Sequence, residues 1–288
     1  MKKIINKTND SAVVGIVTAM LIVGLIVTVI AIIQLVYVPI IMEQREAEHM
    51  DRVAEQFGFL TSVIDKQAVD EKKGIPIATF VTLGSKELPF LVSSKAFGKL
   101  EILENSCTIN IQNDSLNNIY QIGTITYSSA NAYYLNQLYT YEAGAMIVNQ
   151  SPGNMMMVHS DFFIDFNSTY QTLNISFDLV NISGIGQKTI AAGSGICAIQ
   201  TEFYEISVDE IFPQVRNISI TTSNSNAWCV FVNSSLNQAG LEYGNDFYLE
   251  CNGQTVLIDF EPFIFSNELN VRFKIIEIKA QIGPGWIE

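Results

Sequence analysis

Residues 11–42 read SAVVGIVTAMLIVGLIVTVIAIIQLVYVPIIM and contain no Asp, Glu, Lys or Arg. A helix of about 20 apolar residues crosses the hydrocarbon core of a bilayer, so this run is long enough with residues to spare. A buried helix of a soluble protein is rarely so long and so uniformly apolar. We therefore predict a transmembrane helix over residues 12–42, and the lipid bilayer is the first expected partner.

Charged residues on the two sides of this run predict its orientation. Lys2, Lys3 and Lys7 precede it, and acidic residues follow it closely: Glu43, Glu46, Glu48, Asp51 and Glu55. Because Lys and Arg next to a span stay in the cytoplasm, we expect residues 1–11 to form a basic cytoplasmic leader, and everything after residue 42 to lie outside the cell. The run is about twice as long as the apolar core of a cleavable secretory signal, and no small-residue cleavage site closes it.

The composition of the chain excludes some partners. Hydrophobic residues make up 48% of the chain and charged residues only 16%, against about a quarter charged in soluble domains. The formal net charge is −13. Since nucleic-acid binding needs clustered Lys and Arg, this charge argues against nucleic acid as a partner. The apolar residues belong to the predicted membrane helix and the acidic ones to the predicted outer part.

An amphipathic stalk helix is expected to continue the membrane helix over residues 43–73. Pro39 is predicted to kink the helix rather than end it, since periodicity resumes beyond it, and Gly74 and Pro76 mark its end. A stripe of apolar residues, spaced three and four apart as on one helix face, comprises Met50, Val53, Phe57, Leu60 and Ile64. The opposite face is expected to carry charged residues, among them Glu46, Asp51 and Glu55. The stripe could pack on this chain's own domain or on neighbouring copies, and its spacing favours neither.

Beyond Gly74 the apolar residues alternate with a period of two, which is typical of half-buried strands. Residues 173–179 and 256–260 alternate regularly, whereas the alternation over 271–280 slips by one residue at Ile276, which predicts a β-bulge. Asn252–Gly253 is a hairpin signal, and no helical pattern of comparable strength follows residue 75. The predicted fold class is therefore α+β: a long N-terminal transmembrane and stalk helix, then an all-β, antiparallel, sandwich-like ectodomain over residues 75–288, as one unit or as two lobes.

The predicted outer domain has the features of an exported glycoprotein. Its Asn-X-Ser/Thr sequons are at Asn113, Asn167, Asn174, Asn181, Asn217 and Asn233. The alternative is that these are ordinary Asn-rich turns and polar strand faces. Asn174 is expected on the polar face of its strand, where a glycan could be carried.

All four cysteines also fall in this domain, at Cys107, Cys197, Cys229 and Cys251. An even number in an exported domain permits two disulfides, with three possible pairings. Because Cys229 and Cys251 are close in sequence, the favoured pairing is Cys229 with Cys251 and Cys107 with Cys197. The absence of a C-x-x-C motif disfavours zinc and thioredoxin-like chemistry.

Candidate catalytic motifs are few. The two histidines, His49 and His159, are far apart in sequence, and no G-x-S-x-G occurs. Residues 184–189, GIGQKT, lack the upstream glycine of a phosphate-binding loop. Asp161 and Asp165 do not belong to a recognisable calcium-binding loop. We therefore expect no enzyme activity, no cofactor and no metal site.

The segment 131–150 is rich in tyrosine. A surface for glycans or for a protein partner could be formed by Tyr133, Tyr134, Tyr139 and Tyr141, because tyrosine combines a large apolar ring with a polar tip. Tyrosine is also favoured in strands, so cross-strand packing is the favoured alternative.

The N-terminal residues resemble those of a known family. A basic segment, then DSAVVG at residues 10–15, then a long apolar helix that becomes amphipathic, is similar to archaeal type IV pilin-like proteins with a class III signal peptide. The continuation up to Asp65, with the pair Glu48-His49, resembles a poorly characterised surface branch of that family. Residues 139–145 and 193–195 also resemble that branch.

This resemblance implies processing by a prepilin-type peptidase on the cytoplasmic side, near Asp10, Ser11 and Ala12. The released helix would pack with other pilin-like subunits in a filament core, with help from the stripe, through Val13, Gly15, Leu21, Leu25, Ile30, Ile33 and Pro39. The chain departs from the family pattern at Asn9-Asp10, where a basic residue is expected next to the cleavage point.

Two functions from different classes follow as hypotheses. One is a structural or minor subunit of a type IV pilus-like filament on the cell surface. The other is an uncleaved, signal-anchored surface protein whose acidic β-domain binds a glycan, a cation or another protein and forms no filament. The two hypotheses differ in the state of the N-terminus.

Overall fold

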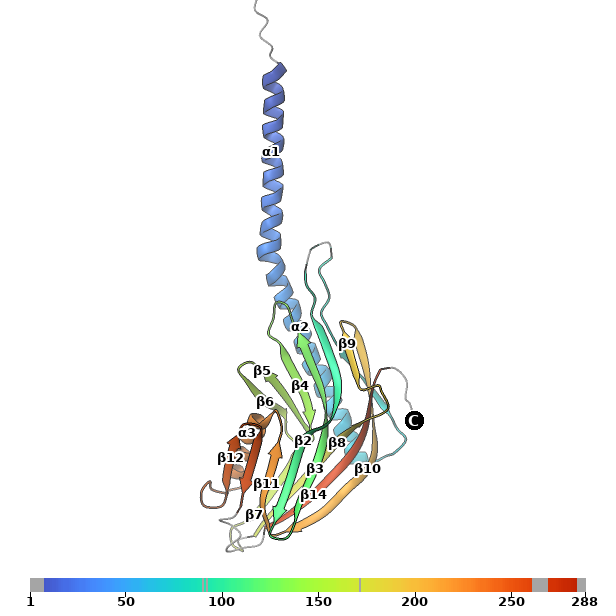
Figure 1. Ribbon diagram of the computed structural model, residues 1–288, viewed down its shortest axis with the longest axis vertical. Coiled ribbons are helices and arrows are strands. Elements are labelled where there is room, and N and C mark those ends of the chain that lie inside the picture. Colours follow the sequence, from blue (N-terminus) through green and yellow to red (C-terminus); the bar gives the residue numbers. More distant parts are fainter. Residues whose placement is uncertain (1–7, 90, 92, 171, 261–268, 284–288) are drawn as a thin grey trace, which may run out of the picture.

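The computed structural model describes residues 8–89, 91, 93–170, 172–260 and 269–283, and in the first helix it describes side chains from residue 13 onward. Most of the predicted leader lies outside these residues, and only the helical backbone is described at Asp10, Ser11 and Ala12. A long helix leads into a domain built mostly of strands (Figure 1). This confirms the predicted order of one long N-terminal helix followed by a β-rich domain.

The helix runs through Pro39 without interruption. It comprises α1 (Thr8–Ile32), a π-helical turn η1 (Ile33–Tyr37) and α2 (Val38–Asp70). Pro39 has no N–H to donate, and in a regular α-helix its ring would clash with the carbonyl group four residues earlier. The turn before it is wider, since Val38 N–H donates to Ile33 O, five residues back. The helix therefore continues as predicted, and its direction changes between α1 and α2 (Figure 1).

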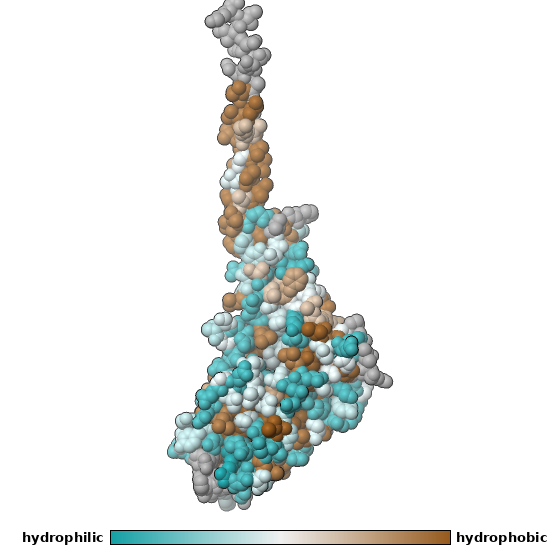
Figure 2. Space-filling model, viewed as in Figure 1, coloured by the Kyte–Doolittle hydropathy of each residue, from teal (hydrophilic) through white to brown (hydrophobic). Residues whose placement is uncertain are grey.

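Only the first part of this helix stands clear of the domain, where its surface is predominantly apolar (Figure 2). The helix is long and apolar enough to cross a membrane, with a mean hydropathy of 3.1 over a window of which 0% is buried. It ends at Asp70, where Glu71 adopts a left-handed conformation with φ of 50°. This end lies three residues before the predicted one, at residue 73.

The described residues of the domain form two sheets. One has the strand order β1 (Ile77–Thr82), β10 (Ile196–Pro213), β14 (Leu269–Ile282), β8 (Thr172–Gly184) and β7 (Asp161–Asn167). The other has the order β12 (Tyr248–Asn252), β13 (Thr255–Asp259), β11 (Val215–Thr221), β2 (Phe97–Asn113), β3 (Asn117–Ala130), β4 (Gln137–Glu142), β5 (Ala145–Gln150) and β6 (Gly153–Val158), and β9 (Ile190–Gly193) pairs with β2. The sandwich-like arrangement that we predicted is compatible with these two sheets.

One strand pair contradicts the prediction of a purely antiparallel domain. β8 and β14 are parallel, with Leu173 opposite Leu269 and Gly184 opposite Ala280. Parallel neighbours need a long crossover connection, and here the chain between them contains β9 to β13 and another helix. Alternation within a strand shows which of its side chains are buried but not which strand pairs with it. The parallel pair, and hence the mixed sheet, could therefore not be predicted from local patterns.

Two hydrophobic cores lie within the domain, and the long strands contribute to both. β14 contributes Ile275 to the first core and the next residue, Ile276, to the second. β8 makes the same change at Leu179 and Val180. The slip that we predicted at Ile276 thus marks the passage from one core to the other. At this position β14 pairs with β8 without a break in register. Its pairing with β10 is irregular, because β10 has extra residues that face no residue of β14. The predicted bulge therefore lies in β10 and not in β14.

The helix α3 (Ser225–Gln238) contradicts the prediction of an all-β ectodomain. Its sequence is short and rich in Val, Phe, Asn and Ser, which have lower helix propensity than Ala or Leu. Trp228, Val232 and Leu236 are four residues apart and are buried in the first core. Burial of this face stabilises the helix, because the helix propensity of its residues alone would be insufficient.

Candidate functional site

The exposed part of the long helix is the first candidate site. Every residue from Val13 to Ile30 is exposed, so apolar side chains point outward in all directions around the axis. The predicted assembly residues on this surface are Val13, Leu21, Leu25 and Ile30, together with Gly15, where an added Cβ would meet no atom within 4 Å. Ile33 and Pro39, nearer the domain, are half-buried. None of the described residues covers this apolar surface.

The apolar stripe, in contrast, is fully used within the chain. Its five residues, Met50, Val53, Phe57, Leu60 and Ile64, are buried in the second core. There they are joined by Val81 of β1 and Tyr127 of β3, and the rings of Phe57 and Tyr139 lie 6.0 Å apart. Of the two alternatives for the stripe, the structure shows packing on the chain's own domain. The stripe is therefore unavailable to neighbouring copies, contrary to the assembly role that the resemblance implied.

Glu46 is buried, although we predicted it on the polar face of the stalk. It lies four residues before Met50 and therefore continues the buried face. Its carboxylate accepts three backbone N–H groups of the loop 131–136: Ala132 at 3.0 Å, Tyr133 at 2.7 Å and Tyr134 at 2.7 Å. Hydrogen bonds to a charged acceptor are roughly twice as strong as neutral ones, and they make burial of this carboxylate tolerable. Glu46 thus fastens the loop to the helix.

A second loop is fastened to the same part of the helix. Arg45 Nη1 donates to the carbonyl oxygen of Glu87 at 3.1 Å, in the connection 83–96 between β1 and β2. The Glu87 side chain pairs with Lys95 at 3.2 Å. Glu46 and Arg45 are adjacent in sequence, so both loops meet the helix within one turn. Sequence patterns did not predict either contact, because the partners lie more than 40 residues away.

His49 anchors the helix one turn further on. Tyr127 Oη donates to Leu83 O at 2.8 Å and accepts a hydrogen bond from His49 Nε2 at 3.1 Å. Burial lowers the pKa of His49, because desolvation disfavours the imidazolium ion. Gln56 adds two bonds to Thr82, through the Thr82 hydroxyl and backbone N–H. These polar contacts fix the helix against the β1–β2 connection.

The tyrosine-rich segment is used for packing and not for an exposed surface. Tyr139 and Tyr141 are buried in the second core, and burial raises the pKa of Tyr139 to about 12. Tyr141 Oη donates to Asp65 Oδ1 at 3.2 Å. Tyr133 and Tyr134 are half-buried and contribute their backbone N–H groups to Glu46. The structure thus favours the cross-strand alternative at the two strand positions.

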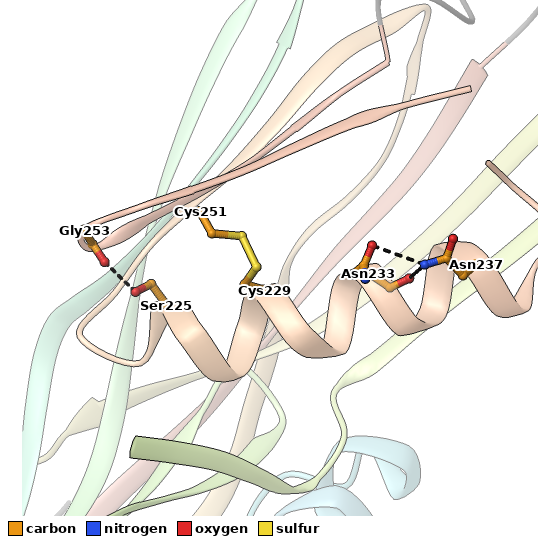
Figure 3. Close-up of a disulfide and its surroundings, with 6 residues drawn as sticks. All are labelled: Ser225, Cys229, Asn233, Asn237, Cys251 and Gly253. Atoms are coloured by element: carbon orange, nitrogen blue, oxygen red, sulfur yellow. Dashed lines mark hydrogen bonds between the residues drawn. A yellow bond between two sulfur atoms is a disulfide. The ribbon is translucent and has the colours of Figure 1, made fainter. Parts of the chain in front are cut away.

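The cysteines form one of the two predicted disulfides. Cys229 on α3 is bonded to Cys251 on β12, as predicted (Figure 3). The predicted bond between Cys107 and Cys197 is wrong, since both are free thiols. Cys107 belongs to the first core and Cys197 packs against the second, so the two-core architecture separates them.

The sequon asparagines differ in how far their side chains are free. Asn174 is exposed on β8, as predicted, and Asn233 is exposed on α3. The carboxamide oxygen of Asn233 accepts a hydrogen bond from Asn237 Nδ2 at 3.2 Å (Figure 3). The Asn167 carboxamide oxygen accepts the N–H groups of Thr169 and Tyr170 in a turn, as does Asn113 with two following residues, and Asn217 is half-buried. Asn181 is engaged at both ends: its oxygen accepts Gly123 N–H and its nitrogen donates to Glu277. A glycan on Asn181 would replace one of the two hydrogens of the Nδ2 group that donates to Glu277.

Acidic and histidine side chains gather at one cavity of about 360 Å³ at the C-terminal end of α2, lined among others by Asp65, His159, Asp161 and Asp178. Burial raises the pKa of Asp65 to about 6, with a smaller contribution from Asp161. Within the described ranges, no group of three or more His, Cys, Asp or Glu side chains is placed to hold a metal ion. The cavity therefore has acid–base groups but no recognisable metal site.

Another buried carboxylate, Glu142, connects two secondary-structure elements of the domain. It accepts hydrogen bonds from Trp228 Nε1 at 2.6 Å, from the Thr222 hydroxyl at 2.7 Å and from Asn224 Nδ2 at 3.3 Å. Burial raises the pKa of Glu142, because desolvation disfavours the charged form. Its contacts tie the end of β4 to the start of α3.

A basic cavity of about 670 Å³ lies beside the end of the long helix. Lys279 Nζ lies 3.4 Å and Lys73 Nζ 5.3 Å from the centre of the Tyr204 ring. Neither lysine takes part in an ion pair among the residues that the structure describes. Glu202 also lines the cavity, and its carboxylate accepts Gly74 N–H at 2.6 Å. This site was not predicted from the sequence, because its lining residues come from four separate segments of the chain.

Comparison with protein-family models, with curated proteins and with solved structures finds no match to this chain.

Proposed function

We propose that this protein is an outward-facing subunit of a type IV pilus-like surface filament, anchored in the membrane by its N-terminal helix before assembly. One observation supports this above all: a single continuous helix has a bare apolar half, while its second half is buried in the chain's own domain. A subunit of this kind can exchange the lipid around α1 for the helices of neighbouring subunits while its domain stays folded.

The surface of α1 limits the environments in which it is stable. Burying one Leu or Ile side chain contributes about 1.5–3 kcal/mol, so a helix with such side chains on every side needs an environment without water. Lipid and a bundle of apolar helices both meet this condition. Gly15 and Gly24 have open space at the Cβ position, and small residues let neighbouring helices approach closely. Because the stripe is already buried, we expect assembly to depend on residues 13–33 and on contacts between β-domains.

The proposed topology has the N-terminus in the cytoplasm and the β-domain outside. Lys2, Lys3 and Lys7 before the apolar run support it through the positive-inside rule. The disulfide between Cys229 and Cys251 also supports it, because disulfides persist in oxidising compartments. Processing near Ser11 by a prepilin-type peptidase would leave a mature helix that begins within α1. The role is structural and not catalytic.

Two measurements test the proposal in the native cells. Mass spectrometry is expected to find a mature N-terminus near Ser11 or Ala12, and immunogold electron microscopy is expected to find the chain in surface filaments. An Ile26→Glu variant is expected to abolish filaments, since a charge within an apolar helix bundle is costly. The matched control is Ile211→Glu, at an exposed position of β10, which should assemble normally. An intact leader, or filaments unaffected by Ile26→Glu, contradicts the proposal.

The second candidate function is that of an uncleaved, signal-anchored binding protein. The cavity with Lys73, Lys279 and Tyr204 favours it, because two lysines without an ion-pair partner in the described part of the chain stand out on an acidic domain. Such a cavity suits an acidic glycan. Retention on immobilised heparin is expected to fall in a Lys73→Ala/Lys279→Ala variant but not in Lys66→Ala. Equal retention of the parent and both variants contradicts this function.

A further inference from the structure

The domain reaches back over the last part of the apolar run. Val38 and Met42 belong to the run that ends at residue 42, yet only 2% and 0% of their surfaces are exposed. A lone helix cannot bury its own side chains to this degree, so other parts of the chain lie against it here. The domain therefore begins at the level at which the predicted membrane span ends.

Two loops meet the helix at this level. The connection 83–96 is joined to it by the bond from Arg45 to Glu87, and the loop 131–136 by the bonds to Glu46. We call the described residues of these two loops, 83–89, 91, 93–96 and 131–136, the collar. Figure 1 shows that the neighbouring strands β2, β3 and β4 lie beside α2 at the end of the domain from which α1 emerges. The collar thus faces the side from which the bare helix emerges.

The collar presents apolar side chains that the chain does not cover. Leu135, in the loop 131–136, is 56% exposed, and Leu91, in the connection 83–96, is 37% exposed. Tyr37 is exposed on the helix just before the collar, and Lys86 is exposed in the connection. Exposed leucines together with tyrosine and basic residues are typical of protein surfaces at a membrane interface, where aromatic rings and long basic side chains lie at headgroup level.

Helix geometry places the collar close to the lipid headgroups. At a rise of 1.5 Å per residue, the apolar residues 13–42 form a helix about 45 Å long. A bilayer with its headgroup layers is about 40–45 Å thick, so this helix spans both the hydrocarbon core and the headgroups. Met42 then lies at the outer edge of the headgroup layer. Arg45 and Glu46, to which the two loops are bonded, lie about 5–6 Å further along the axis.

We propose that the collar docks on the outer leaflet of the membrane and that Leu91 and Leu135 insert among the lipid headgroups. The domain would then have a second contact with the bilayer beside the span, which restricts its tilt before assembly. This inference rests on the membrane anchorage in the proposed function, but not on filament formation. The occupant is lipid, because the two leucines are in loops that are bonded to the helix next to the end of its apolar run.

Tryptophan quenching by brominated lipids tests this in the full-length chain, reconstituted into vesicles of phosphatidylcholine with phosphatidylglycerol. Leu135→Trp and Leu91→Trp are expected to show blue-shifted emission and a loss of intensity when the lipid carries bromine near the headgroup end of its acyl chains. The control Phe163→Trp is on the exposed edge strand β7 and outside the collar, and it should show neither effect. The two native tryptophans, Trp228, which is buried in the domain, and Trp286, which lies outside the described residues, are present in every variant, so the emission and quenching of the parent chain are measured as the background and subtracted.

A further variant separates the failure of this inference from failure of the anchorage. Val23→Trp lies in the middle of the span and should be quenched by bromine near the ends of the acyl chains. Quenching at Val23→Trp with none at either collar position overturns the collar proposal alone, whereas no quenching at Val23→Trp overturns the anchorage. A blue shift at the collar that grows with protein density, without quenching, would show that a second copy covers these leucines and would also overturn the proposal. If a collar variant does not fold, the exposed Ala132 offers an alternative position.

Discussion

Replacing Glu46 by glutamine is expected to release the loop 131–136 from the long helix. The carboxylate accepts three backbone N–H groups at 2.7–3.0 Å in a buried position. Glutamine keeps one acceptor oxygen, which can satisfy two of these groups at most, and its NH₂ group then faces the third as a donor. Hydrogen bonds to charged groups contribute about 1.5–3 kcal/mol each. One lost bond and two weakened ones therefore correspond to about 2–3 kcal/mol of local opening free energy.

Hydrogen exchange measures this opening directly. Since about 1.4 kcal/mol is a factor of ten in an equilibrium constant, the amides of Ala132, Tyr133 and Tyr134 are expected to exchange about 30- to 150-fold faster in Glu46→Gln than in the parent chain. The matched control is Glu43→Gln, which removes the same charge from an exposed position one turn earlier. It should leave these rates unchanged. Equal exchange in the Glu46→Gln variant and the parent would refute the role assigned to this carboxylate.

Three other predictions concern the free energy of unfolding of the domain. Phe57→Ala is expected to lower it by about 3–5 kcal/mol in urea unfolding, because the ring is fully buried, whereas Phe59→Ala, 61% exposed on the same helix, should change it by less than about 0.5 kcal/mol. Burial raises the pKa of Asp65 from 3.8 to about 6, so the folded state holds a proton that the unfolded chain has lost, and stability falls as the pH rises through this window. Asp65→Asn is therefore expected to raise Tm at neutral pH, and the gain should shrink toward pH 4 in a series of melting curves. Cys229→Ser is expected to cost about 3 kcal/mol, since its bond to Cys251 closes a loop with a sequence separation of 22. Adding reductant should then have no further effect on the variant.

Local periodicity predicted much of the fold correctly. The stripe at Met50, Val53 and Phe57 is buried along one helix face as its spacing indicated, and Leu173, Ile175 and Phe177 alternate inward on β8. The helix α3 was not predicted, because its residues have low helix propensity and its buried face packs against a core formed by strands that are distant in sequence. The parallel pairing of β8 with β14 was not predicted for a related reason, since alternation indicates which residues are buried but not which strand lies beside them.

The candidate functional sites also depend on contacts that local sequence patterns do not predict. Glu46 was expected on the polar face because an isolated carboxylate is costly to bury, and only the amides of a loop 86 residues away make its burial favourable. Cys107 and Cys197 had compatible chemistry, but the two cores keep them apart. Lys73, Lys279 and Tyr204 form a cavity wall although no motif links them.

Hydrophobic spacing was sufficient to predict an uninterrupted apolar helix that leads into an amphipathic one and then into strands, because spacing within a few residues reflects the geometry of a single element. Only the folded structure shows that the stripe is buried in the chain's own domain while α1 stays bare, and that two loops are bonded to the helix at Arg45 and Glu46. These outcomes depend on contacts between residues far apart in the chain, whose free energies arise only when the folded domain brings the partners together and excludes water.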